Sequence, residues 1–314
     1  MKKLLAIVLC VSMFMVAGCG GSSEKTASGD SSTETVKSEN QSEAYSETES
    51  EETSAEEETE EDTTVETVVL LDENDIYVEY RGLAEYSSTS WLVNLYIENN
   101  SDVEIYVSLR NVLVNDCKVS IANNSATIQP ESKYLVEPNF DFVLDIEDVV
   151  LYGLSNIDTI EYDLEISTDI LGTDIIAETQ VDLDVNKKIT IDTNTPESGE
   201  VILDSEDVYV EYRGIEEYSS QSWIINLYVE NKRDSEIYLS LEDSLINGFN
   251  ISVANNGITI PSNSKYLSGA NFDLVIDVED LESYGIAEVD AIKTELQIKT
   301  SIFGDTIAEA EVSF

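Results

Sequence analysis

Histidine is absent from this 314-residue sequence. The chain therefore has no imidazole general base, no Ser-His-Asp or Cys-His arrangement and no zinc site with histidine ligands. Neither a glycine-rich phosphate loop nor a dinucleotide-binding fingerprint occurs. Carboxylate pairs are so common in the chain that none is marked out for glycoside hydrolysis. We expect a protein that is not an enzyme and that carries no cofactor.

Basic residues are also scarce, with 16 Lys and Arg against 65 Asp and Glu and a formal charge of −49. A surface of this sign repels polyanions, so nucleic acid is excluded as an expected partner. If an ion binds, we expect a cation held by carboxylate and carbonyl oxygens.

Long apolar runs are missing except at the start, where Leu4 to Val16 follow two lysines. Residues 1–18 have the layout of a secretory signal peptide and are short for a membrane span. The next residue is Cys19, and the order Val16-Ala17-Gly18-Cys19 resembles the lipobox of bacterial lipoproteins. That resemblance implies a diacylglyceryl cysteine at Cys19, further acylated (for example by palmitate), and a lipid anchor in the cell membrane. The alternative is an ordinary signal with a bystander cysteine.

Cysteine is rare, with three in the chain. Cys10 leaves with the signal peptide and Cys19 takes the lipid, so Cys117 has no partner within the chain. The sequence therefore predicts no disulfide framework.

Residues 19–67 are dominated by Ser, Thr and Glu and have almost no large apolar side chain. Such a segment buries too little surface to offset the entropy of ordering, so we expect a disordered acidic linker after the lipidated cysteine. It would act as a solvated spacer or, alternatively, as an acidic recognition tail.

The rest of the chain contains one unit twice. Residues 75–172 align with residues 207–304 at a constant offset of 132, and 52 of the 98 pairs are identical. We expect a first repeat at 68–186, a linker at 187–199 and a second repeat at 200–314.

Alternation of apolar and polar residues predicts β-strands in both repeats. Trp91, Val93, Leu95 and Ile97 form one face of such a strand, and Trp223 begins its equivalent. The same period fits segments that include Ile76–Tyr80, Ile105–Leu109, Phe140–Leu144 and Ile160–Ile166. Turn residues separate them, and Gly248 and Gly257 stand where the first repeat has Asp116 and Ser125, which suggests positive φ at these positions.

One segment of each repeat breaks the alternation. Asp145 to Gly153, and Asp277 to Gly285, have an acidic N-cap and a terminal glycine, which predicts a short helix. Many short strands with one short helix favour an all-β fold of two tandem antiparallel immunoglobulin-like β-sandwich domains after the disordered linker. A small open barrel is the alternative.

The lipobox, the acidic linker and the tandem units together resemble immunoglobulin-like surface lipoproteins of unknown function from Gram-positive bacteria. The resemblance implies a location on the outer face of the cell membrane, exposed to the cell envelope or extracellular space. It implies no activity.

Four tyrosines are the candidate ligand surface: Tyr96, Tyr106, Tyr228 and Tyr238. They lie out of phase with the apolar residues of their strands, so we expect them on outer faces, where they either cover the sheet as cross-strand pairs or bind a ligand. Trp91 and Trp223 are in phase with aliphatic residues, which favours core packing over sugar stacking.

Other residues have more ordinary interpretations. Cys117 aligns with Phe249 and is expected to be a small core residue. Arg81 and Arg213 are expected to form salt bridges that orient a turn at the following glycine, in preference to contacting a ligand. The candidate calcium ligands are acidic residues that helix capping also explains: Asp141, Asp145, Glu147 and Asp148, with Asp273, Asp277, Glu279 and Asp280. We expect no bound metal.

The favoured function is a non-catalytic, lipid-anchored surface module for binding or display. Two similar sites on one chain would gain effective concentration against a repetitive partner such as a cell-wall glycan or a multimeric protein. The alternatives are a structural spacer or scaffold on the cell envelope and, third, a calcium-stabilised adhesion module.

The lipobox makes a direct prediction. Cys19→Ala removes the acceptor thiol, so the protein should leave the membrane fraction because only the lipid holds it there. Fractionation of cells and an acyl-label assay would measure this, with Cys10→Ala as the control that retains the anchor. A Cys19→Ala protein that stays in the membrane fraction would contradict the prediction.

Overall fold

The computed structural model describes residues 67–191 and 198–313. The predicted signal peptide, Cys19 and nearly all of the acidic linker lie outside the described residues, as does part of the predicted linker between repeats. The last strand of the first repeat extends to Lys188 and Ile189 is buried, so residues 187–189 belong to the folded repeat.

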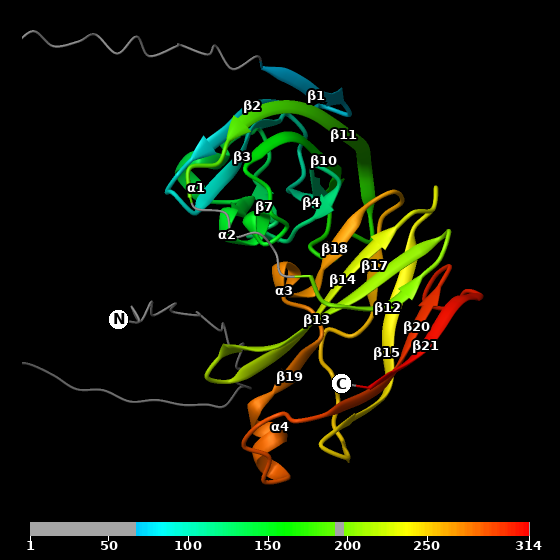
Figure 1. Cartoon of the computed structure of the whole chain (residues 1–314). Coiled ribbons are helices and arrows are strands. Elements are labelled where there is room, and N and C mark those ends of the chain that lie inside the picture. The colour runs from blue at the N-terminus through cyan, green and yellow to red at the C-terminus, as the bar shows by residue number, and fades with distance from the viewer. Residues whose placement is uncertain (1–66, 192–197, 314) are drawn as a thin grey trace, which may run out of the picture. The chain divides into compact units, whose positions relative to one another are not determined.

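The first repeat consists of two sheets (Figure 1). One sheet contains β1 (Val68–Glu73), β2 (Ile76–Glu85), β3 (Ser90–Asn99), β6 (Ile121–Ala122), β8 (Ser132–Leu135) and β9 (Val143–Asp145). The other contains β4 (Ile105–Val114), β5 (Cys117–Lys118), β7 (Ser125–Ile128), β10 (Asn156–Ser167) and β11 (Ile175–Lys188). Its helices are α1 (Val136–Asn139) and α2 (Ile146–Val150).

The second repeat has the corresponding elements. One sheet has β12 (Glu200–Asp204), β13 (Val208–Ser219), β14 (Ser222–Asn231), β18 (Lys265–Leu267) and β19 (Val275–Asp277). The other has β15 (Ile237–Ile246), β16 (Phe249–Asn250), β17 (Ile258–Ile260), β20 (Ile292–Lys299) and β21 (Thr306–Ser313). Its helices are α3 (Ser268–Asn271) and α4 (Val278–Ser283).

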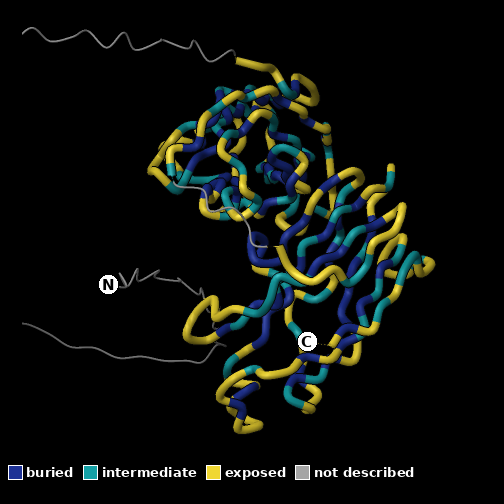
Figure 2. Tube along the Cα trace, in the orientation of Figure 1, coloured by how far each residue is buried: buried dark blue, intermediate teal, exposed yellow. Residues whose placement is uncertain are grey.

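Each repeat has one apolar core formed by both of its sheets. On β3, Trp91, Val93, Leu95 and Ile97 are all buried, as the alternation predicts, and the same burial along other strands is visible in Figure 2. Each such side chain contributes about 1.5–3 kcal/mol by leaving water. The chain is therefore all-β, with antiparallel pairing within each repeat.

The glycine after Arg81 lies inside a strand and not in a turn. Between Tyr80 and Leu83 the pairing of β2 with β3 shifts register, and Gly82 has φ 92°. The second repeat has the same β-bulge at Gly214, with φ 106°. A side chain at this φ would be strained, so both repeats keep glycine there.

The predicted helix is present in both repeats. Asp145 and Asp277 are the N-caps of α2 and α4, and each accepts a hydrogen bond of 2.8 Å from the amide two residues on. The turn predicted at Asp116 and Gly248 also has positive φ, at 62° and 83°. Ser125 does not, since it lies within β7.

The segment around Phe140 differs from the predicted strand. Here α1 ends in Phe140, whose φ is 58° and whose amide donates to the carbonyl of Val136 at 3.0 Å. Phe142 also has positive φ, at 52°, and β9 begins only at Val143. Phe142 is fully buried, and that burial offsets the strain of a left-handed backbone.

Cys117 is buried by the second repeat, which corrects its expected place in the core of its own repeat. Cys117 is 2% exposed, whereas Phe249 at the same position is 43% exposed. The strand β5 pairs in parallel with β18 through Cys117 and Lys265, and the Lys265 amide donates to the carbonyl of Asp116 at 2.8 Å. Burial raises the Cys117 pKa to about 12, so the thiol is unreactive.

The pairing of β5 with β18 joins the two repeats. Through it, the sheet that contains β4 and β10 continues into the sheet that contains β13 and β14, and the two repeats belong to one compact unit.

A buried asparagine at the end of β3 forms hydrogen bonds to neighbouring loops of the first repeat. The Asn99 side-chain amide contacts the carbonyls of Val103, Ile128 and Gln129 at 2.8, 3.2 and 3.1 Å, and its oxygen accepts from the Ser101 amide. Asn231 makes the equivalent contacts in the second repeat. The Asn99 side chain thus adds to the backbone bond between these two loops, which runs from the Glu131 amide to the Ser101 carbonyl at 3.2 Å.

Asn99→Ala should destabilise the first repeat by about 2–4 kcal/mol, because the buried carbonyl of Ile128 and the part-buried carbonyls of Val103 and Gln129 lose their donor. Urea denaturation followed by tryptophan fluorescence would measure the loss. Asn100→Ala is the matched control, since Asn100 is exposed and the second repeat has Lys232 there. Equal stability of the two variants would show that the buried amide is not needed.

Candidate functional site

The four predicted surface tyrosines are half-buried and do not form one patch. In the first repeat, Tyr96 lies on β3 and Tyr106 on β4, which belong to different sheets. In the second repeat, Tyr228 on β14 and Tyr238 on β15 are separated in the same way. Their outward phase was predicted correctly, but the expected neighbours lie on opposite faces of the repeat.

Tyr96 instead belongs to a cluster with residues of β2. The ring of Tyr77 meets the ring of Tyr96 edge-on, with centroids 6.3 Å apart. The guanidinium carbon of Arg81 lies 4.2 Å from the Tyr96 ring centroid. Glu79 accepts hydrogen bonds from the Tyr77 hydroxyl and from Nε of Arg81, both at 2.7 Å.

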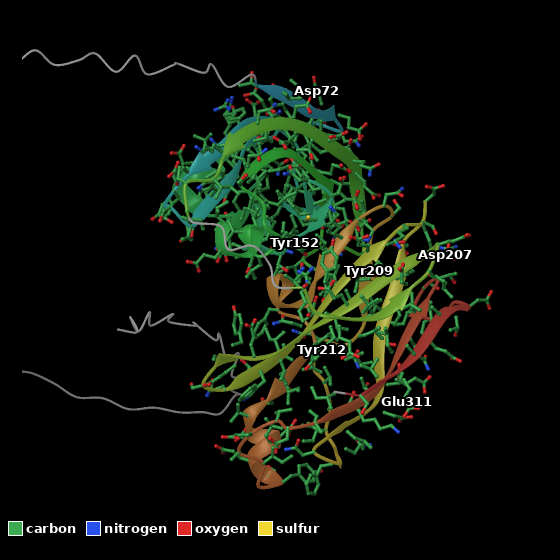
Figure 3. The ribbon with its side chains drawn as sticks, in the orientation of Figure 1. Asp72, Tyr152, Asp207, Tyr209, Tyr212 and Glu311 are labelled. Carbon is green, nitrogen blue, oxygen red and sulfur yellow. The ribbon has the colours of Figure 1, made fainter. Side chains whose placement is uncertain are left out.

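The second repeat builds the same cluster. The Tyr209 and Tyr228 rings have centroids 6.3 Å apart, and the Arg213 guanidinium carbon lies 4.1 Å from the Tyr228 centroid. Glu211 accepts from the Tyr209 hydroxyl and from Nε of Arg213, each at 2.8 Å. The labelled Tyr209 and Tyr212, three residues apart on β13, mark this strand in Figure 3. We call these two sets the tyrosine–arginine clusters. The first consists of Tyr77, Glu79, Arg81 and Tyr96; the second consists of Tyr209, Glu211, Arg213 and Tyr228.

The sequence contains the signal for these clusters. Tyr77, Glu79 and Arg81 alternate with the buried Ile76, Val78 and Tyr80, so they share the outer face of β2. The Arg81 salt bridge was predicted from the sequence, whereas the role of Tyr77 and its contact with Tyr96 were not. That contact depends on the register that pairs Glu79 with Tyr96.

The glutamate of each cluster pairs with the arginine and one tyrosine, and in the second repeat Glu211 also accepts a hydrogen bond of 2.7 Å from the Gly199 amide. The hydrogen bonds from Tyr77 and then Arg81 lower the pKa of Glu79, and the Glu79 carboxylate raises the pKa of Tyr77. Glu79 therefore stays ionised and Tyr77 stays a hydrogen-bond donor near neutral pH. Each cluster presents two phenol rings and an arginine, and a lysine also lies near one ring: Nζ of Lys133 is 5.8 Å from the Tyr96 centroid and Nζ of Lys232 is 5.6 Å from the Tyr209 centroid.

Tyr106 and Tyr238 have simpler surroundings. The Tyr106 hydroxyl donates to Glu104 at 2.6 Å, which raises the Tyr106 pKa. In the second repeat, a Cβ at position 257 would overlap the Tyr238 hydroxyl, and Gly257 has φ 141°. This close approach explains why glycine replaces Ser125 at the equivalent position.

The acidic residues predicted as calcium ligands do not converge. Asp145 caps α2, and Asp141 accepts from the Tyr134 hydroxyl. Among residues 67–191 and 198–313, no group of three or more Cys, His, Asp or Glu is arranged to hold a metal. The calcium-stabilised alternative therefore has no ligand set in this part of the chain.

Both tryptophans pack against the cores, as predicted. Trp91 is fully buried and Trp223 is half-buried against the second core. Nζ of Lys187 lies 4.6 Å from the Trp91 ring centroid. Neither tryptophan is placed as an open stacking platform for a sugar.

Asp148 on α2 is the acid with the most perturbed surroundings. Burial, and then the charges of Asp145 and Glu147, raise its pKa to about 8. Burial is the main cause that raises the pKa of Tyr152 and Tyr218, and the nearby Asp148 carboxylate adds to the increase in both. Tyr152, labelled in Figure 3, reaches the second repeat, where its hydroxyl accepts from the Leu267 amide at 2.8 Å.

Comparisons with known proteins give little further information. No family model matches the chain, and no curated protein matches it. Among solved structures, the chain is similar to the YadV chaperone, with 11% identity, a TM-score of 0.24, and coverage of 76% of this chain and 100% of that one. It is also similar to the CsuC–CsuE chaperone–tip adhesion subunit complex of Acinetobacter baumannii, with 12% identity, a TM-score of 0.20, and coverage of 70% and 90%. TM-scores this low support no inference about fold or function.

Within the described part of the chain, no helix has the length and apolar character required to cross a membrane.

Ionisation of Asp148 predicts a pH-dependent stability. Its pKa is about 8 when folded and 3.8 ordinarily, so between these values the folded state holds a proton that the unfolded state has lost. Stability contributed by this group therefore falls as pH rises through that window. Asp148→Asn should be about 2 kcal/mol more stable than the natural chain at pH 8, with the difference shrinking toward pH 5.

Urea midpoints at several pH values would measure this difference. Asp280→Asn, at the corresponding position of α4, is the matched control for the loss of a helix carboxylate. A difference that stays the same from pH 5 to pH 8 would contradict the predicted protonation of Asp148.

Proposed function

We propose that the chain is a non-catalytic binding module, held at the outer face of the cell membrane by a lipid on Cys19. Its two repeats act as tandem immunoglobulin-like β-sandwich domains, and its partner is a repetitive polymer or protein of the cell envelope. The observation that carries the proposal is the tyrosine–arginine cluster, which occurs with matching geometry in both repeats.

Tyrosine and arginine are the residues most enriched where binding energy is concentrated, because they combine large contact area with hydrogen-bonding groups. In each cluster the carboxylate fixes the arginine and one tyrosine, so little side-chain entropy remains to be lost on binding. The ring planes and the guanidinium suit stacking on a sugar face or contact with a protein surface.

A hollow of about 590 Å³ lies on β20 and β21, lined by residues that include Lys293, Glu295, Glu309 and Glu311. Lys293 is already paired with Glu311. No imidazole base lies in this hollow, because the chain has no histidine.

Two clusters of the same geometry on one chain predict avidity, although the second is less exposed, with the Arg213 side chain 17% exposed against 36% for Arg81. The second contact on a repetitive partner is intramolecular, so the pair binds about 10²-fold or more tighter than one cluster alone. A spacer or scaffold without a ligand would show no such dependence on the clusters.

Retention on isolated cell envelopes would test the proposal with residues 20–314. Tyr96→Ala or Tyr228→Ala alone should weaken retention about tenfold to a hundredfold, and the double variant should abolish it. Tyr106→Ala with Tyr238→Ala is the matched control on the opposite sheets and should bind normally. Equal retention of all variants, or none by the natural chain, would favour the spacer or scaffold.

A further inference from the structure

The two repeats contact each other through unlike surfaces. The first repeat contributes its β5 edge, which we define as Asp116, Cys117, Lys118, Ser120 and Tyr152. The second repeat contributes its β18 edge, defined as Thr259, Lys265, Tyr266, Leu267 and Asn271.

Hydrogen bonds hold these two edges in register. The Asn271 side chain donates to the Lys118 carbonyl at 3.0 Å, and the Leu267 amide donates to the Tyr152 hydroxyl at 2.8 Å. Nζ of Lys118 donates to the Thr259 carbonyl at 2.6 Å. Because one edge differs from the other, the contact is heterologous and leaves one edge of each kind uncovered.

The uncovered edges are the duplicates of the covered ones. In the second repeat, the β16 edge (Gly248, Phe249, Asn250, Ser252 and Tyr284) corresponds to the β5 edge. In the first repeat, the β8 edge (Thr127, Lys133, Tyr134, Leu135 and Asn139) corresponds to the β18 edge. Within the described residues, β16 pairs only with β15 and β8 pairs only with β3.

Exposure shows what the contact covers. Leu267 is 5% exposed in the occupied edge, and Leu135 is 40% exposed in the free one. Asn271 is buried and Asn139 is exposed. Phe249 and Tyr284 are 43% and 50% exposed, so the two free edges carry large apolar side chains into solvent.

The strand residues of the occupied β18 edge recur in the free β8 edge, whereas the adjacent helix differs, with Glu137 and Pro138 of α1 in place of the buried Gly269 and Ala270 of α3. All five residues that define the β8 edge are identical to their counterparts. The Asn139 amide already donates to the Leu135 carbonyl at 2.7 Å, as the Asn271 amide does to the Leu267 carbonyl at 2.9 Å. The Asn139 side chain therefore already has the orientation in which Asn271 bonds to the β5 edge.

The free β16 edge keeps most of the groups that make the contact and loses the bond that Nζ of Lys118 makes to the Thr259 carbonyl, because Asn250 stands at that position. The bonds from Asn271 and Lys265 end on backbone carbonyls, so they do not depend on the replacement of Lys118 by Asn250. Tyr284 supplies the hydroxyl that Tyr152 supplies in the occupied edge. Phe249 replaces Cys117 with a larger apolar side chain, and its ring centroid lies 5.1 Å from that of Tyr284.

We propose that the β16 edge of one chain docks on the β8 edge of a second copy of this chain, repeating between chains the contact that joins the two repeats. Each chain then has one edge of each kind, so copies associate head to tail in an open series. The high negative charge of each chain opposes association. The association should therefore become stronger as added salt screens the repulsion between chains.

Sedimentation velocity of residues 20–314 over a range of concentrations would test this proposal at physiological and higher salt. The natural chain should grow beyond a dimer as its concentration rises. Leu135→Glu destroys the β8 edge and Phe249→Glu destroys the β16 edge, so each variant alone should be monomeric. An equal mixture should form a dimer and nothing larger, because one intact edge of each kind remains.

Asn139→Ala and Tyr284→Ala are milder second variants at exposed positions, and each should weaken association at least tenfold with the melting temperature unchanged. A natural chain that is monomeric at every concentration would overturn the proposal. So would a mixture of the two Glu variants that does not dimerise, or a single Glu variant that still assembles, since another surface would then be responsible. None of these results depends on envelope retention through the tyrosine–arginine clusters.

Discussion

The alternation of side chains along a strand is the constraint on which the rest of this structure depends. Once Ile76, Val78 and Tyr80 are buried in the core, the residues between them must lie on the outer face of β2. The apolar half of each strand therefore stabilises the repeat, and the other half is available for Tyr77, Glu79 and Arg81. Val208 and Val210 are buried in the second repeat as Ile76 and Val78 are in the first, so both repeats present the same tyrosine–arginine cluster.

Features encoded by short-range signals were predictable from the sequence. The period of two identified the inward residues of β3 and β10, and the acidic N-cap with a terminal glycine identified α2 and α4. The helix α1 and the left-handed Phe140 and Phe142 were not predictable in this way. Their backbone is set by the burial of Phe142 against residues distant in sequence, which offsets the local strain.

The candidate site was only half predictable for a related reason. Phase showed that Tyr96 and Tyr106 point outward, but phase does not say which sheet a strand joins. The partners of Tyr96 are set by the pairing register of β2 with β3, and a bulge at Arg81 and Gly82 shifts that register. The surroundings of Cys117 could not be predicted from its counterpart Phe249. The two positions correspond in sequence, but Cys117 lies against the second repeat and Phe249 has no such neighbour.

The contact edges of the two repeats have diverged to different extents, and the free energy needed to form each contact explains the difference. The residues that define the β8 and β18 edges are identical, whereas Cys117 and Lys118 of the β5 edge become Phe249 and Asn250 in the β16 edge. Within one chain the two repeats are covalently linked, which keeps the β5 and β18 edges close together. The small Cys117 and Lys118, whose pKa is lowered by burial, are then enough to hold the contact. A contact between separate chains must also offset the loss of translational and rotational freedom. The larger apolar side chain of Phe249 therefore stands on the edge where more apolar area would be required.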